Sequence, residues 1–121
     1  MMRKILIVDD AIFMRNYIKD ILLEEGFEVA GEAENGEEAI EKFKQLNPEI
    51  ITMDIVMPVM NGIDAVREIL KINSGVKIVM CSALGQEALV MEAIEAGAAD
   101  FITKPFKKAR VIDVLKKLNS A

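Results

Sequence analysis

Three aspartates and one lysine each follow a short apolar segment of this chain, and side chains of these types can carry out phosphoryl transfer. The residues are Asp9 and Asp10 after residues 5–8, Asp54 after residues 50–53, and Lys104 after residues 101–103. Parallel α/β sheets bind their ligands beyond the carboxyl ends of the strands. If the apolar segments are strands of one sheet, we expect the four side chains to meet at a single edge.

The clustered carboxylates indicate a metal ion. Two carboxylates about 5 Å apart repel each other by roughly 3 kcal/mol at an effective dielectric near 20, and a divalent cation relieves this repulsion. The chain has no histidine, so the ligands available at this edge are oxygens, which favours Mg²⁺, with Mn²⁺ as a substitute, over zinc. Lys104 supplies a compact, mobile positive charge that can hold a phosphoryl oxygen opposite the metal.

Each aspartate alone has a simpler interpretation. An aspartate after a strand is commonly a turn residue or the N-cap of a helix. The prediction of a phosphoryl-transfer site therefore depends on the combination of all four residues.

The elements that must position these residues follow from hydrophobic periodicity. Five short apolar runs with the character of buried parallel strands lie near residues 4–8, 27–31, 50–53, 76–81 and 100–103. The segments between these runs have apolar residues at helical spacing, which predicts a helix in each. Asn35 is predicted to cap the start of the second helix, and Gly26, Asn47-Pro48 and Gly97 are predicted to end helices.

This regular alternation predicts an α/β fold with a doubly wound five-stranded parallel sheet of the flavodoxin-like type, strand order 2-1-3-4-5. The first and third strands are then neighbours. Asp9, Asp10 and Asp54 would converge where the strand order reverses.

Composition limits the possible functions. A chain of 121 residues with 52% hydrophobic residues fits one domain over residues 1–121. The net charge of -5 argues against nucleic acid or an anionic membrane as the main partner. Only four strongly apolar residues lie between the start, Met1 to Lys4, and Asp9, which is too short for a signal peptide or a membrane span. The single cysteine, Cys81, lies in an apolar run where we expect a buried thiol. We therefore expect a cytoplasmic protein and take it to be a monomer.

Over nearly its whole length the chain resembles response-regulator receiver domains, among them the stand-alone receivers of chemotaxis. The matching segments are residues 7–10, residues 54–58 with Asn61-Gly62, Ser82-Ala83, Gly97-Ala98, and residues 101–106. The resemblance implies that Asp54 is the phosphoacceptor and that Asp10 and the Val56 carbonyl bind the metal. It also implies that Asp9 acts largely through water and that Lys104 pairs with the phosphoryl group.

The resemblance further implies a conformational switch. Ser82 would donate to the phosphoryl oxygen, and Phe101 would then turn inward and remodel the face made by the fourth helix, fifth strand and fifth helix. Many relatives carry Thr and Tyr at these two positions, so we expect a switch that relies on packing, with weaker coupling to the output face. A cis peptide is implied at Lys104-Pro105.

The implied function is that of a chemotaxis response regulator in a two-component system. It would accept a phosphoryl group from a histidine kinase (CheA-like), dock on a flagellar switch protein (FliM-like), and be reset by a phosphatase. It would catalyse only its own phosphorylation and dephosphorylation. Apolar Val56 and Leu84 at the site's rim cannot orient an attacking water, which predicts a long-lived phosphoprotein.

Three other functions are considered. A phosphorelay intermediate, which passes its phosphate to another histidine protein, fits the same residues. A Mg²⁺-dependent phosphatase of the haloacid-dehalogenase-like type needs a carboxylate two residues after the nucleophile, where this chain has Val56. An FMN carrier is disfavoured because the acidic loop after the first strand would repel the flavin phosphate.

Overall fold

The computed structural model describes residues 3–119; residues 1–2, at the start of the segment that is too short for a signal peptide, and residues 120–121 lie outside this range. Strands and helices alternate strictly along the chain. The strands are β1 Lys4–Val8, β2 Glu28–Ala33, β3 Ile50–Asp54, β4 Lys77–Ser82 and β5 Asp100–Thr103. The helices are α1 Ile12–Glu24, α2 Gly36–Leu46, α3 Gly62–Ile72, α4 Glu87–Ala96 and α5 Lys108–Asn119. The predicted alternation is confirmed.

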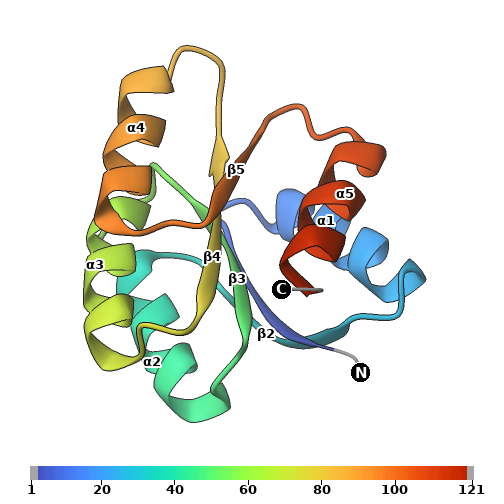
Figure 1. The fold of residues 1–121 in the computed structure, drawn as a ribbon, viewed down its shortest axis with the longest axis horizontal. Coiled ribbons are helices and arrows are strands. Elements are labelled where there is room, and N and C mark those ends of the chain that lie inside the picture. The colour runs from blue at the N-terminus through green and yellow to red at the C-terminus, as the bar shows by residue number, and fades with distance from the viewer. Residues whose placement is uncertain (1–2, 120–121) are drawn as a thin grey trace.

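The strands form one parallel sheet in the order β2-β1-β3-β4-β5, which confirms the predicted order. In register, Val8 of β1 lies beside Met53 of β3, and Asp54 lies beside Cys81 of β4. Helices α2, α3 and α4 cover one face of the sheet, and α1 and α5 cover the other (Figure 1).

Two apolar cores hold these layers together. Leu6, Ile51 and Met53 of the sheet pack with residues of α2, α3 and α4, such as Phe43 and Ile69. The alternate residues of the same strands, including Ile5, Ile7 and Ile50, pack with α1 and α5. This alternation follows from the two-residue period of a strand. Cys81 belongs to the second core and is buried, as predicted.

The second strand differs from its predicted range of residues 27–31. It begins at Glu28, because the Phe27 N–H donates instead to the carbonyl of Leu22 (3.0 Å) and closes the end of α1. It continues to Ala33, and its pairing with β1 shifts register between Ile5 and Leu6. Glu32 and Ala33 are poor strand formers, so the local sequence predicts too early an end for a strand that pairing with Ile7 and Val8 of β1 extends.

The predicted helix boundaries are confirmed. The Asn35 side chain accepts a hydrogen bond from the Glu38 N–H (2.8 Å) and caps α2. Asn47 and Gly97 adopt left-handed conformations at the ends of α2 and α4, with φ of 49° and 118°. Gly26 follows α1 with φ of 83°.

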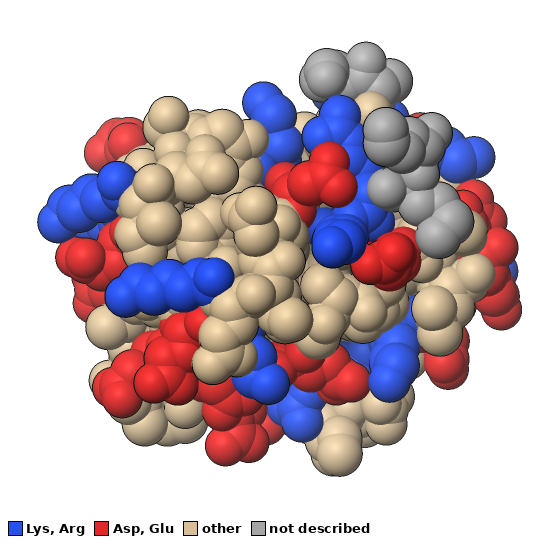
Figure 2. All heavy atoms as spheres, turned by 90° about the horizontal axis from the view of Figure 1, so that it is seen from below, with Lys and Arg blue, Asp and Glu red and all other residues tan. Residues whose placement is uncertain are grey.

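Charged side chains of both signs are distributed over the surface. On the face shown in Figure 2, Lys and Arg are interspersed with Asp and Glu, next to an area without charged residues. Ion pairs such as Arg3 with Glu49 (3.4 Å) contribute to this mixture. Within residues 3–119, none of the helices has the length and apolar character needed to span a bilayer.

Candidate functional site

The three predicted aspartates meet at the carboxyl edge of the sheet. Asp54 is the last residue of β3 and Asp9 directly follows β1, and both are buried, whereas Asp10 is exposed. One carboxylate oxygen from each aspartate lies within 4.8 Å of the others. The adjacency of β1 and β3 produces this convergence, as the sequence predicts.

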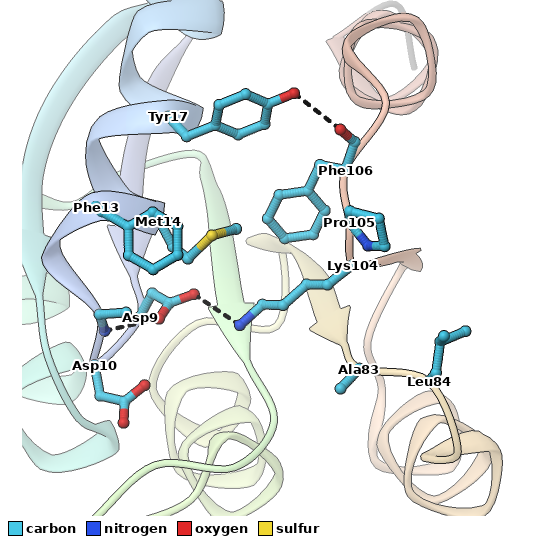
Figure 3. Close-up of a pocket in the computed structure, with 11 residues that line it drawn as sticks. Asp9, Asp10, Phe13, Met14, Tyr17, Ala83, Leu84, Lys104, Pro105 and Phe106 are labelled. Carbon is cyan, nitrogen blue, oxygen red and sulfur yellow. Dashed lines mark hydrogen bonds and ion pairs between the residues drawn. The ribbon is translucent and has the colours of Figure 1, made fainter.

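Lys104 extends from the end of β5 into the same cluster. Its Nζ lies 3.1 Å from Asp9 Oδ2 (Figure 3) and 3.4 Å from Asp54 Oδ2. One ammonium group therefore pairs with two buried carboxylates. Its backbone N–H donates to the carbonyl of Ser82 at 2.7 Å, which fixes the start of the side chain beside β4. The Lys104-Pro105 peptide is cis, as the resemblance implied.

The cluster alters the acidity of its members. Burial and, to a smaller extent, the neighbouring carboxylate of Asp9 raise the pKa of Asp54, and although Lys104 opposes both effects the net result is a pKa of about 6. Burial alone would lower the pKa of Lys104, but the charges of Asp54 and Asp9 raise it on balance. Lys104 therefore stays protonated at neutral pH, and burial of Asp54 destabilises its charged form.

The residues present fit a hard divalent cation. Asp9 Oδ2 is fully buried and accepts no hydrogen bond within residues 3–119, although Lys104 lies close to it. A buried carboxylate oxygen that pairs with Lys104 but accepts no further donor from the described residues keeps capacity to bind a cation, and two further carboxylates lie beside it. All the candidate ligands are oxygens, which suits Mg²⁺ or Mn²⁺. Asp9, Asp10 and Asp54 could hold the ion.

The loop from β3 to α3 turns back sharply on Asp54. The Gly62 N–H donates to the Ile55 carbonyl at 2.7 Å, and a Cβ on Gly62 would lie only 2.1 Å from the Asp54 carbonyl oxygen. Only glycine fits this approach. The Met60 carbonyl accepts from the Gly36 N–H at 2.9 Å, which attaches the loop to the start of α2.

Val59, in the same loop, has a strained backbone. Its φ is 68°, and the Met60 N–H donates to the Pro58 carbonyl at 2.7 Å across it, which makes a γ-turn. A β-branched residue rarely adopts a positive φ. The sequence analysis did not identify this position, although its place between Pro58 and Asn61-Gly62 is typical of a turn.

Hydrogen bonds also fix the backbone of Asp9. Its N–H donates to the Ala33 carbonyl of β2 at 3.1 Å, and its Oδ1 accepts from the Ala11 N–H at 2.9 Å. Its carbonyl accepts from the Arg15 guanidinium at 2.6 Å. Arg15 is not among the site residues predicted from the sequence. The signal was an arginine in the first turns of a helix, where a positive charge opposes the helix dipole.

An open cavity of about 850 Å³ adjoins the cluster between α1 and the loops after β4 and β5 (Figure 3). Asp9, Asp10 and Lys104 line one part of it, and the rest is mainly apolar. The Tyr17 hydroxyl donates to the Phe106 carbonyl at 2.9 Å, and the two rings stack at a centroid distance of 6.4 Å. Lys104 both lines the cavity and pairs with Asp54, so an incoming group in the cavity lies near the acidic cluster.

The two predicted switch residues line a second cavity of about 230 Å³. Ser82, the last residue of β4, is buried, and Phe101 of β5 is 38% exposed. Leu84 lines this cavity too and is 80% exposed, and Val56 is 55% exposed in the loop after Asp54. The cavity leaves space beside Phe101 on the side of Ser82.

Comparison with known proteins gives a consistent result. The family model described as response regulator receiver domain matches residues 5–116. The chain is 60% identical over 117 residues to the chemotaxis protein CheY of Thermotoga maritima, covering 97% of this chain and 98% of that protein. It is 56% identical to the chemotaxis protein CheY of Bacillus subtilis with the same coverage.

A solved structure of similar fold is the CheX-CheY-BeF3-Mg complex from Borrelia burgdorferi. It superposes with a TM-score of 0.91 at 37% identity, covering 97% of this chain and 89% of that one. The likeness therefore extends over the whole α/β sheet and its helices.

Proposed function

This chain belongs to the response-regulator receiver family, with CheY proteins of chemotaxis among its relatives, and we propose that it accepts a phosphoryl group on Asp54. The observation that carries the proposal is the contact of one ammonium group, Lys104 Nζ, with Asp54 and Asp9 at the converging strand ends. A buried carboxylate beside a cation and two further acidic groups is suited to in-line attack on phosphorus.

The chemistry follows from the positions of the residues. An Asp54 oxygen attacks the phosphorus of the donor, the bond from phosphorus to the leaving group breaks, and an acyl phosphate forms. Lys104 neutralises charge on the phosphoryl oxygens as they move. Asp9, Asp10, Asp54 and the Val56 carbonyl would hold Mg²⁺, which supplies further positive charge to the transferring group. The open cavity lies on the side from which a donor would approach.

The donor is proposed to be a phosphohistidine on a histidine kinase or a small acyl phosphate. The chain contains no histidine of its own, so a phosphohistidine would have to come from another protein. The chemotaxis names of its relatives support a kinase of that pathway and a flagellar switch protein as output partner. The solved complex of a related CheY with CheX supports a further protein partner.

Signal output is proposed to run from Ser82 to Phe101. A phosphoryl group on Asp54 would attract the Ser82 hydroxyl and the loop after it. The cavity that Ser82 and Phe101 share could then receive the aromatic ring. Movement of Phe101 would alter the surface formed by α4, β5 and α5, which is the proposed docking face.

The test is the intact mass of the protein after incubation with acetyl phosphate and Mg²⁺. We expect a gain of one phosphoryl group that is lost in Asp54→Asn and when a chelator is added. Asp113→Asn, an exposed aspartate on α5, is the matched control and should be phosphorylated like the wild type. No gain in the wild type, or a gain that persists in Asp54→Asn, would refute the assignment.

The phosphorelay alternative stays a prediction. It uses the same residues, and the two functions differ in the partner of the phosphorylated form. Transfer of labelled phosphate from this protein to a second histidine protein would favour the relay, whereas phosphorylation-dependent binding to a flagellar switch protein would favour chemotaxis.

A further inference from the structure

Arg15, in the second turn of α1, contacts the backbone of the acidic cluster without entering it. Its side chain is only 13% exposed. One guanidinium nitrogen donates to the Asp9 carbonyl at 2.6 Å, and Nε donates to Glu32 Oε1 at 3.0 Å. A single planar side chain therefore joins the loop after β1 to β2.

Glu32 holds the guanidinium in place. It lies on β2 opposite Ile7 of β1, and its second carboxylate oxygen pairs with Lys19 Nζ at 3.3 Å. Because the guanidinium group of Arg15 is planar and rigid, the hydrogen bond from Nε to Glu32 also sets the direction of the nitrogen that donates to the Asp9 carbonyl.

The placement of Arg15 is unfavourable for the helix itself. The start of α1 has no side-chain cap and no acidic residue in its first turn. A cation near a helix N-terminus opposes the dipole. The contacts of Arg15 with Glu32 and the Asp9 carbonyl offset this unfavourable interaction with the helix dipole. Arg15 therefore stabilises the loop after β1 and not the start of α1.

The loop needs this contact because Asp10 is exposed and its carboxylate takes its position from the backbone. The Asp9 N–H donates to the Ala33 carbonyl, and Asp9 Oδ1 accepts from the Ala11 N–H. The remaining freedom is rotation of the peptide between Asp9 and Asp10, and the carbonyl of that peptide is the group that Arg15 holds.

We propose that Arg15 is a positioning residue that orients the Asp9-Asp10 peptide and so places the Asp10 carboxylate for Mg²⁺. This inference rests on the proposed function, since it assumes that the cluster binds the ion. Arg15 acts through the backbone of Asp9 and touches neither the phosphoryl group nor the metal.

The experiment is calorimetric titration of the full-length protein with Mg²⁺, at a temperature where urea unfolding shows each variant to be folded. We expect Arg15→Ala to weaken Mg²⁺ binding roughly 10-fold, in the range seen when a group that orients a metal ligand is removed. Arg15→Lys should recover part of the lost affinity. An ammonium can reach the Asp9 carbonyl, but it lacks the second donor nitrogen with which the guanidinium binds Glu32 at the same time. Lys19→Ala is the matched control, since it removes the other cation on Glu32, and should bind within about twofold of wild type.

A second readout does not depend on the metal. Amide hydrogen exchange at Ala11 in metal-free protein should quicken in Arg15→Ala and stay unchanged in Lys19→Ala, because the Ala11 N–H bonds to the Asp9 side chain. If Arg15→Ala fails to fold, Arg15→Lys and Glu32→Gln give the same comparison with smaller expected losses.

The outcomes separate this inference from the proposed function. Equal Mg²⁺ affinity in wild type and Arg15→Ala, even with lower stability, would overturn the positioning role and leave the proposed function intact. Absence of Mg²⁺ binding in the wild type would overturn both. An equal loss in Lys19→Ala would show a general charge effect and overturn the specific role of Arg15.

Discussion

Lys104 Nζ lies 3.4 Å from Asp54 Oδ2, across the edge of the sheet from β5 to β3. The two residues are separated by one strand, β4, whose Ser82 carbonyl binds the Lys104 N–H. The lysine therefore reaches the proposed phosphoacceptor from a fixed backbone position. The ammonium is already placed where negative charge would develop during transfer.

Replacing this lysine should slow phosphorylation. We expect Lys104→Ala to lower the second-order rate constant with acetyl phosphate by roughly 10²-fold, because one preorganised charge on the transferring group is lost. Lys104 lowers the pKa of Asp54, so the acid limb of the pH profile should also move to higher pH. Lys107→Ala, an exposed lysine three residues later, is the control and should behave like wild type. An unchanged rate in Lys104→Ala would contradict this role.

Asp54 should make the metal-free protein less stable at neutral pH than at mildly acidic pH. Its folded pKa, about 6, lies above the ordinary aspartate value of 3.8, so the folded state binds the proton more tightly. The destabilisation is then fully present above about pH 6 and is relieved as the pH falls toward 4. Asp54→Asn should be more stable than wild type by about 1–3 kcal/mol at pH 7.5, and the difference should shrink by pH 4.5. Urea unfolding in the presence of a chelator measures the stability of the wild type and Asp54→Asn at both pH values. A stability difference that does not change with pH would show that the raised pKa of Asp54 is not its cause.

The exposed apolar residues at the rim should prolong the life of the acyl phosphate. Val56 and Leu84 offer no group that could orient an attacking water. We expect the double variant Val56→Asn, Leu84→Glu to hydrolyse its phosphate several-fold faster, which is less than the roughly 10²-fold lower end of general acid–base effects. Loss of the phosphoryl mass over time measures the rate. A rate that does not rise would count against this explanation, and Ile72→Asn, an exposed apolar residue at the end of α3, controls for surface polarity.

The γ-turn at Val59 should be a site where stability can be gained. Asn tolerates a positive φ better than a β-branched residue, and Val59 is 76% exposed, so little apolar burial is lost. Val59→Asn is expected to stabilise the fold by about 0.5–1.5 kcal/mol. Leu84→Asn is the control, because Leu84 is equally exposed and has no positive φ. Equal effects of the two substitutions in urea unfolding would show that backbone strain is not the cause.

The strands and the acidic cluster could be predicted because they depend on local patterns. Buried β-branched runs mark β1, β3 and β4, and a residue just after such a run must lie at the edge of the sheet. This pattern locates Asp9 and Asp54, and the shorter apolar run at residues 101–103, in which only Ile102 is buried, locates Lys104. Even the adjacency of β1 and β3 follows from the alternation of strands with helices.

What could not be predicted depends on contacts between distant segments. The C-terminal extent of β2 is set by pairing of Glu32 and Ala33 with β1, and these two residues have low strand propensity on their own. The contact of Arg15 with Glu32 joins residues 17 positions apart. The positive φ of Val59 is held by neighbours, since the Met60 carbonyl and Gly62 are both fixed by other parts of the fold.

The bond from Tyr17 to the Phe106 carbonyl gives the protein a built-in optical reporter. Tyr17 is the single tyrosine of a chain without tryptophan, so excitation near 280 nm is dominated by one ring at the wall of the large cavity. That ring spans from α1 to the loop that follows Lys104. Its emission therefore records whether these two segments stay together, and it does so without a label or an engineered fluorophore.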